Sequence, residues 1–223
     1  MWHDAALVAG KDLRIELRSR VGAQQVAPFA LVVLVLFAFA FDADHALLLK
    51  AAPGLFWVAV LFAAVLSIQR SFAVESADGG RDRLRLSGMD PAGIFLGKAG
   101  AVAVQLLVLQ LVLAAGVAIL YSSRLGDAAV LVATCLVATV GLAAAGTIYG
   151  VVATAVGASE TLLPLLLMPV VAPVLLCATK AWQAALGTGA TGDALGWLRF
   201  LGVFAVVYVA AGVLAFGPLV EEG

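Results

Sequence analysis

Six long stretches of this sequence contain no Asp, Glu, Lys or Arg, and this pattern limits the possible folds more than any other feature. The stretches are residues 21–41, 51–69, 99–123, 128–159, 161–179 and 200–220. A helix needs about 20 apolar residues to cross a hydrocarbon core roughly 30 Å thick. Each stretch is therefore long enough for one crossing. Even the longest, 128–159, falls short of the about 40 residues that two crossings would require.

The overall composition agrees with a membrane protein. Hydrophobic residues make up 64% of the chain and charged residues 12%, whereas soluble domains carry roughly 45–50% apolar and about 25% charged residues. A soluble fold could not cover its surface with so few polar groups. We therefore predict an all-α polytopic membrane protein with six transmembrane helices, in which residues 1–223 form a single transmembrane domain.

Basic residues are divided unequally between the two sides that six spans define. The side with both termini holds nine, which are Lys11, Arg14, Arg18, Arg20, Arg70, Arg81, Arg83, Arg85 and Lys98. The other side holds four, which are Lys50, Arg124, Lys180 and Arg199. Cytoplasmic segments carry the excess of Lys and Arg, so we predict cytoplasmic termini. Trp57, Trp182 and Trp197 then lie near the outer ends of spans, where aromatic belts form.

Residues 2–20 precede the first span and combine apolar and charged side chains. At 100° per residue, one apolar stripe is formed by Trp2, Ala6, Ala9, Leu13 and Leu17. Lys11, Arg14 and Arg18 lie on the other side. This pattern predicts an amphipathic helix in the cytoplasmic interface of the membrane. A helical extension of the first span is the alternative, but a glycine and a proline that follow favour a bend.

Two connecting segments are long enough to form structure of their own. Residues 70–98 make the one substantial cytoplasmic connection. Residues 180–197 are mildly apolar and rich in glycine, which predicts a short helix or a re-entrant piece at the outer surface. The long span at 128–159 should be tilted or kinked near Gly141, Gly146 or Gly150.

The spans lack the residues expected of a catalytic or ion-translocating site. None has an acidic or basic residue near its middle, where ion-coupled transporters place ionisable groups. Gln105 and Gln110 do not share a helix face, so we interpret them as packing contacts. His45 is interpreted as a solvated loop residue, and Cys135 and Cys177 as buried thiols without a disulfide. We predict no catalytic residues and no metal site.

Residues 93–99 are the nearest approach to a nucleotide-binding motif. A phosphate-binding loop has the pattern G-x-x-x-x-G-K-[ST] after a strand. The segment from Gly93 to Gly97, followed by Lys98, is one residue short and opens a membrane helix. The chain is therefore not expected to bind ATP itself. Gly93 and Gly97 fit a small-residue packing pattern better, as do Gly146 and Gly150.

One run in the second stretch and the segment after it is more specific than the rest. It consists of Ala52-Pro53-Gly54-Leu55-Phe56-Trp57-Val58-Ala59, then Gln69-Arg70-Ser71-Phe72, Glu75, Asp78-Gly79 and Leu84-Arg85-Leu86. This pattern is similar to A-P-G-x-x-W-V-A, E-R-x-F and D-G in the haem exporter protein B (CcmB) family. The start at residues 11–18 and the prolines of the fifth stretch also resemble that family.

The resemblance implies an ABC-2 exporter-like permease subunit of an ATP-driven complex that handles haem in cytochrome c biogenesis. It implies a bacterial inner membrane location, a separate CcmA-like ATPase subunit, and CcmC-like and CcmD-like membrane subunits. It also implies two copies per complex, with ATP and haem carried by partner proteins and no cofactor bound directly. A membrane scaffold that transports nothing is the alternative. Nothing suggests a nucleic-acid partner.

With an ATPase partner implied, residues 70–98 are expected to be the coupling element, because both ends are fixed to membrane helices. The residues predicted to dock the ATPase are Phe72, Glu75, Gly79, Leu84 and Leu86. The secondary basic residues are Arg81, Arg83 and Arg85. Apolar anchors usually dominate an interface, and charges tune its rate and register. In the alternative, the arginines only hold the loop near anionic lipid.

Overall fold

The computed structural model describes residues 1–19, 27–40, 45–77, 88–120, 127–155, 159–188 and 193–222. Within these residues all regular structure is α-helical, which confirms the all-α prediction. The helices are α1 (Trp2–Ser19), α2 (Ala27–Ala40), α3 (His45–Ala77), α5 (Pro91–Leu120), α6 (Ala128–Ala155), α7 (Ser159–Ala185) and α8 (Ala194–Glu222).

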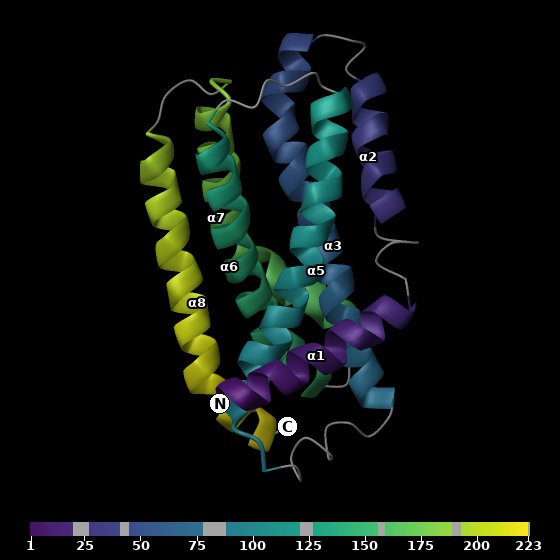
Figure 1. Ribbon diagram of the computed structural model, residues 1–223, viewed down its shortest axis with the longest axis vertical. Helices are drawn as coiled ribbons and strands as arrows, with labels where there is room; N and C mark the ends of the chain where they lie inside the picture. Colours follow the sequence, from purple (N-terminus) through teal and green to yellow (C-terminus); the bar gives the residue numbers. More distant parts are fainter. Residues whose placement is uncertain are drawn as a thin grey trace.

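Helices α2 to α8 form an elongated bundle whose successive members run up and down its long axis (Figure 1). Helix α1 differs from the others, because it crosses the lower part of the bundle obliquely, against α5 (Figure 1). It is a separate helix and not a continuation of α2. Both α1 and the end of α8 lie at the lower end, where α3 ends and α5 begins (Figure 1).

Five helices are long and apolar enough to cross a membrane. These segments are Leu47–Ala73, Pro91–Ile119, Ala128–Thr154, Leu162–Ala185 and Ala194–Leu219. They correspond to five of the six predicted spans. Helix α2 has 14 residues, or about 21 Å at 1.5 Å per residue, and its flanking residues 20–26 and 41–44 are not described. A sixth span there stays a prediction.

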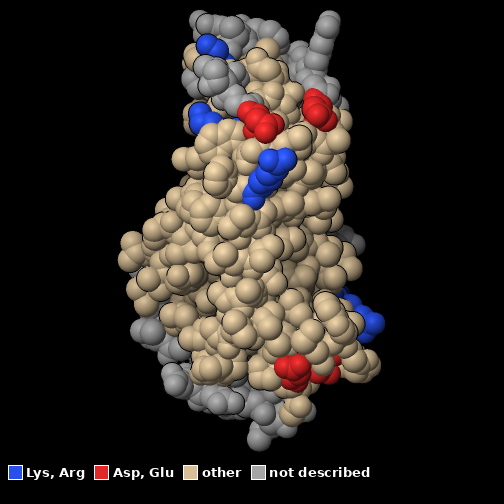
Figure 2. Space-filling view, turned by 90° about the vertical axis from the view of Figure 1, so that its left-hand side faces the viewer, with Lys and Arg blue, Asp and Glu red and all other residues tan. Residues whose placement is uncertain are grey.

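The surface of the bundle is that of a membrane protein. On the face drawn in Figure 2, charged side chains gather toward the two ends, and a broad band without them lies between. Large apolar side chains are exposed along α8, and these are Leu195, Phe200, Val203, Val206, Val207 and Leu214. So large an exposed apolar surface is rare on soluble proteins. The chain is a multi-pass membrane protein.

Glycines of α6 seat side chains of α3 in the core. A Cβ atom on Gly146 would collide with Ile68, and one on Gly150 would collide with the ring of Phe72. Ile68 is fully buried and Phe72 is 5% exposed. The small-residue packing predicted for Gly146 and Gly150 is confirmed, because only glycine leaves room for α3 at this distance.

The tryptophans expected in an outer aromatic belt are placed differently. Trp57 and Trp182 are buried and form a cluster with Phe56, which stacks on Trp182 with the ring centroids 4.2 Å apart. The indole N–H of Trp182 also donates to the carbonyl oxygen of Leu131, 3.3 Å away. The belt prediction is wrong for these two residues, because helix α3, α6 and α7 atoms surround them. Of the three tryptophans in the belt prediction, only Trp197 is partly exposed.

The predicted outer piece at 180–197 is also corrected. Helix α7 continues to Ala185 and ends in a turn at Gly187, whose φ of 65° suits glycine. Helix α8 begins at Ala194, with the Asp193 carboxylate accepting a hydrogen bond from the Leu195 N–H at 3.0 Å. In the described residues this segment therefore extends two spans and forms no separate helix.

Candidate functional site: the polar junction beneath helix α1

Charged and uncharged polar side chains from three helices meet where α1 crosses the lower ends of α3 and α5. We call this group the polar junction. It consists of Asp12 and Glu16 of α1, Ser67, Arg70 and Ser71 of α3, and Lys98 and Gln105 of α5. Residues 78–90 join α3 to α5, and of these the structure describes 88–90. The junction therefore lies at both roots of the segment predicted to be the coupling loop.

Lys98 is the most deeply buried charged residue of the junction, with 2% of its side chain exposed. Its ammonium nitrogen lies 3.5 Å from Oδ2 of Asp12 and 4.7 Å from the ring centroid of Phe72. Burying an ammonium group is costly unless an opposite charge accompanies it. The carboxylate of Asp12 supplies that charge, and the face of the aromatic ring adds a cation–π contact.

A second ion pair ties α1 to α3. The Nε atom of Arg70 lies 3.6 Å from Oε2 of Glu16, and both side chains are mostly buried. Between the helices lies a cavity of about 30 Å³ lined by polar groups, Gln105 among them, which is space for about two water molecules. Gln110, higher in α5, instead donates a 2.8 Å hydrogen bond to the Thr139 hydroxyl. It serves as a packing contact, as predicted.

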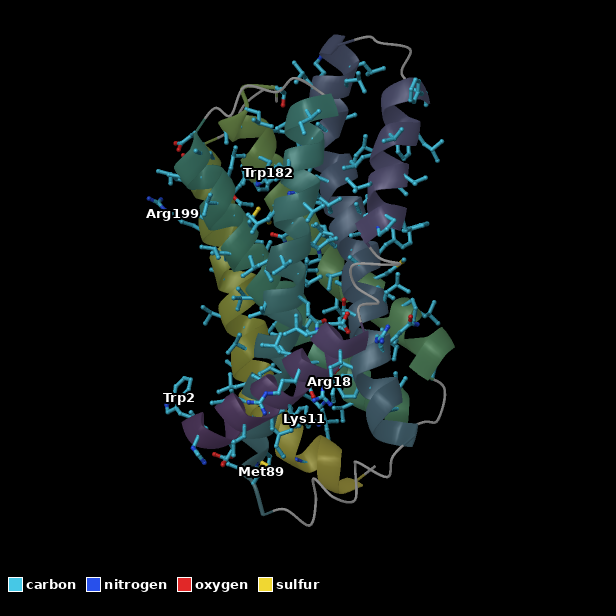
Figure 3. The ribbon with its side chains drawn as sticks, turned by 45° about the vertical axis from the view of Figure 1, so that its right-hand side comes forward. Trp2, Lys11, Arg18, Met89, Trp182 and Arg199 are labelled. Atoms are coloured by element: carbon cyan, nitrogen blue, oxygen red, sulfur yellow. The ribbon has the colours of Figure 1, made fainter. Side chains whose placement is uncertain are left out.

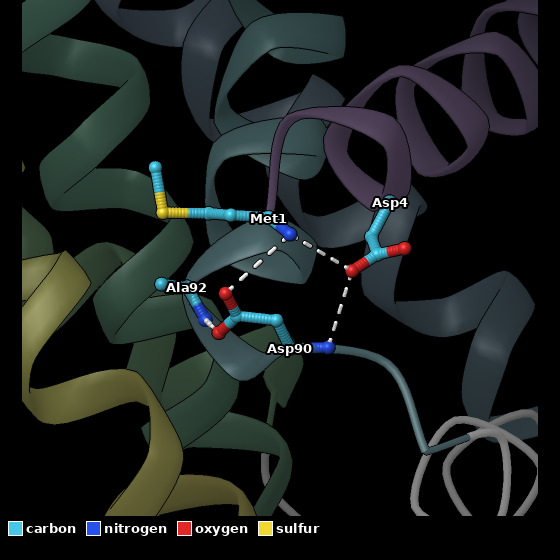
Figure 4. Close-up of polar contacts among 4 residues, drawn as sticks. All are labelled: Met1, Asp4, Asp90 and Ala92. Atoms are coloured by element: carbon cyan, nitrogen blue, oxygen red, sulfur yellow. Dashed lines mark hydrogen bonds and ion pairs between the residues drawn. The ribbon is translucent and has the colours of Figure 1, made fainter.

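The first turn of α1 is fastened to the start of α5 (Figure 4). The amino group of Met1 lies 3.2 Å from Asp4 and 3.6 Å from Asp90. The Asp90 N–H donates to Asp4 at 3.4 Å, and the Asp90 carboxylate accepts from the Ala92 N–H at 3.0 Å, which caps α5. The hydrogen bond from the amino group lowers the pKa of Asp4, and Asp4 in turn raises the pKa of the amino group.

Two glycines let α1 lie directly on α5. A Cβ atom on Gly97 would lie 2.7 Å from the carbonyl oxygen of Ala5 and 2.7 Å from Cβ of Val8. One on Gly93 would lie 2.8 Å from the carbonyl oxygen of Met1. All three distances are shorter than real Cβ contacts allow, so any other residue would push the helices apart. This supports the packing interpretation of Gly93 and Gly97 over a phosphate-binding loop.

The faces of α1 are only partly those that the sequence predicted. The apolar stripe is exposed at its ends, with Trp2 75% and Leu17 76% exposed, as an interfacial helix requires. The face toward the bundle, however, carries Ala5, Val8 and the two acids of the junction. Asp12 and Glu16 were not singled out from the sequence. The signal that could have found them is their spacing of four residues, about one helical turn.

Most residues predicted to dock an ATPase lie beyond the described part of the chain. These are Gly79, Arg81, Arg83, Leu84, Arg85 and Leu86, and of Glu75 only the backbone is described, within α3. Phe72 is described, and its buried ring packs between Lys98 and Gly150. It therefore helps to hold the root of the loop. In the described residues no group of His, Cys, Asp and Glu could hold a metal ion.

Comparison with known proteins gives the family. The model of the family described as CcmB protein matches residues 4–222. The chain is 33% identical to "Heme exporter protein B" of Haemophilus influenzae over 177 residues, which are 78% of this chain and 79% of that protein. It is 32% identical to the protein of the same name from Paracoccus denitrificans, covering 77% and 78% of the two chains. The relative from Pseudomonas aeruginosa is 29% identical over 94% of each.

Proposed function

The chain belongs to the CcmB protein family, and from this membership we propose that it is the permease subunit of an ATP-driven complex handling haem in cytochrome c biogenesis. The observation that carries the proposal is the family match over residues 4–222, nearly the whole chain. The name of the relatives, "Heme exporter protein B", supports a role in haem export. In this proposal the chain is not itself an enzyme, and ATP and haem are bound by partner subunits.

The partners that we propose are a CcmA-like ATPase, a CcmC-like haem-handling membrane subunit and a small CcmD-like membrane subunit. Two copies of this chain would supply the two membrane halves of an ABC-2 type exporter, packed through small-residue helix faces. The chain would lie in a bacterial inner membrane. Hydrolysis of ATP would be coupled to release of a haem-loaded chaperone or to export.

The coupling path that we propose runs through the loop at residues 70–98 and the polar junction. Leu84 and Leu86 would dock the ATPase, with Glu75, Gly79 and the arginines at 81, 83 and 85 at the rim of the contact. Phe72 would anchor the root of the loop. Because Arg70 and Lys98 each pair with α1, a push on the loop would move α3, α5 and α1 together.

The orientation that we propose has both termini and the loop on the cytoplasmic side, with the α2 region as the sixth span. Single cysteines at Ala43, Ser122 and Gly192 should then react with a membrane-impermeant reagent from outside, and those at Ser76 and Gly223 only after the membrane is opened. The chain for this test needs Cys135 and Cys177 replaced by alanine. Labelling of position 76 from outside would overturn the orientation. If position 43 does not react from outside, the proposal that the α2 region spans the membrane is contradicted.

The function itself is tested by the release of haem-loaded chaperone from the complex in nanodiscs. Complexes assembled with and without this chain are given ATP or a non-hydrolysable analogue, and released chaperone is measured by its haem absorbance. The proposal expects release that requires both hydrolysis and this chain. Undiminished release by complexes without the chain would contradict it. Purification of the chain with haem-handling subunits but no ATPase would favour the scaffold instead.

A further inference from the structure

The outward side of α1 carries a second hollow, which shares Lys11 and Ile15 with the small cavity of the polar junction. Its volume is about 410 Å³, and its lining within the described residues is Ala6, Leu7, Gly10, Lys11, Arg14, Ile15 and Arg18. These residues lie on the side of α1 that is turned away from α5, whereas Ala5 and Val8 are buried against it. Figure 3 shows Lys11 and Arg18 along α1, at the end of the bundle opposite Arg199.

The hollow is positively charged because the carboxylates of Asp12 and Glu16 form ion pairs on the side of α1 that faces the bundle. Asp12 and Glu16 pair with Lys98 and Arg70. Lys11 also contacts the other oxygen of Asp12 at 3.3 Å. For the exposed Arg14 and Arg18, the described part of the chain offers no carboxylate within ion-pair distance. Two guanidinium groups therefore face the outside without a charge to balance them.

The floor of the hollow is a glycine that helix packing does not explain. Gly10 lies in the middle of α1, where glycine lowers helix stability relative to alanine. A Cβ atom there would meet nothing within 4 Å, in contrast to Gly93 and Gly97 on the facing helix. Without a Cβ atom at this position, the surface between Leu7, Lys11 and Arg14 stays open.

We propose that this hollow binds the headgroup of an anionic phospholipid, with the phosphate held by Arg14 and Arg18. Guanidinium groups match phosphate oxygens in paired hydrogen bonds. Leu7 is 55% and Ile15 36% exposed beside the cations, and the apolar ends of the helix, Trp2 and Leu17, are exposed as well. A lipid fits this combination, because its phosphate meets the arginines while its acyl chains meet the leucine and isoleucine. A free anion would leave the apolar side chains uncovered.

The test measures retention of phosphatidylglycerol and phosphatidylcholine by the purified chain with native mass spectrometry. Three variants are compared with the wild type. R14Q/R18Q removes the charge, Gly10→Phe fills the hollow and keeps the charge, and K180Q/R199Q removes the same charge from the opposite end. Each cationic side chain near anionic lipid contributes to lipid binding, and the loss of two should lower the affinity for phosphatidylglycerol about 30-fold. Gly10→Leu serves as a second filling variant if the phenylalanine prevents folding.

The proposal expects the wild type and K180Q/R199Q to retain phosphatidylglycerol in preference to phosphatidylcholine. Both R14Q/R18Q and the filled variants should lose that preference, and excess inorganic phosphate should not displace the lipid. If the filled variants still retain phosphatidylglycerol, the lipid is attracted by the charge of the helix and not bound in the hollow, and the proposal is overturned. Displacement by inorganic phosphate would show a site for soluble anions instead. If R14Q/R18Q retains lipid as the wild type does but no longer binds an ATPase subunit, the surface binds a protein partner and the lipid proposal is overturned.

Discussion

The ammonium group of Lys98 lies 3.5 Å from the carboxylate of Asp12, so that a buried charge on α5 is balanced by a charge on the helix crossing it. The two residues are 86 positions apart in the sequence. Their contact makes α1 part of the same unit as the ends of α3 and α5, because Arg70 and Glu16 add a second link one turn further along α1.

Removing one member of the buried pair should cost more stability than removing both. Asp12→Asn takes the carboxylate charge of Asp12 away from the buried ammonium of Lys98, and the expected loss is about 3 kcal/mol. The double variant D12L/K98M replaces both charges by apolar groups and should lose less than either single change. Thermal unfolding of the protein in detergent checks this. Additive losses in the double variant would mean that the two charges do not interact.

Close packing of α1 on α5 should make Gly97 intolerant of substitution. Gly97→Ala places a methyl group 2.7 Å from a backbone oxygen of α1, and displacement of that helix should cost about 1–3 kcal/mol. Gly100→Ala is the matched control, because nothing lies within 4 Å of a Cβ atom there. It should be neutral or stabilising by up to about 1 kcal/mol. Hydrogen exchange of residues 2–19 should quicken only in the first variant. Equal exchange in both would contradict the packing.

Attachment of the first turn of α1 should depend on pH at both ends of the scale. The pKa of Asp4 is lowered below its ordinary value of 3.8. The contribution of Asp4 to holding the turn is therefore complete above pH 3.8 and is lost as the pH falls through the lowered pKa. The pKa of the Met1 amino group is raised above 8.0, so its contribution is complete below 8.0 and is lost as the pH rises through the raised pKa.

A nitroxide label at His3 measures this attachment through its mobility. The label should be most restricted between the two transitions and become mobile at both extremes. Asp4→Asn should remove the acid transition and leave the label mobile throughout. A restricted label in that variant would show that the ion pair does not hold the turn. The label requires the background without Cys135 and Cys177.

The spans could be predicted from the sequence because charge in a lipid core is costly at any rotation of the helix. Which face of a span is buried could not be predicted in the same way. Helices such as α3 and α7 are apolar all round, so no periodicity distinguishes lipid from protein neighbours. Trp57 and Trp182 show the consequence, since their position along the helix suggested a belt and their packing makes them core residues.

The polar junction could not be predicted from the sequence for a related reason. Lys98 is the eighth residue of α5. From the sequence it was considered only as a basic residue near the end of a span and as part of a rejected phosphate-binding motif. Lys98 is buried by α1, which is distant from α5 in the sequence and packs across it in the fold. A contact of this kind depends on the tertiary path of the chain. The glycines at 93 and 97, in contrast, were recognisable as a packing pattern before their partner was known.

In the proposed function, the loop at residues 70–98 transmits force from an ATPase to the membrane helices. Complexes that carry L84S/L86S test this role through the amount of ATPase subunit that they retain and its rate of ATP hydrolysis. These complexes should lose the ATPase, while the chain stays folded by circular dichroism. R81Q/R83Q/R85Q should weaken retention less, since apolar anchors dominate an interface. An ATPase that stays bound and fully active on L84S/L86S would contradict this role of the loop.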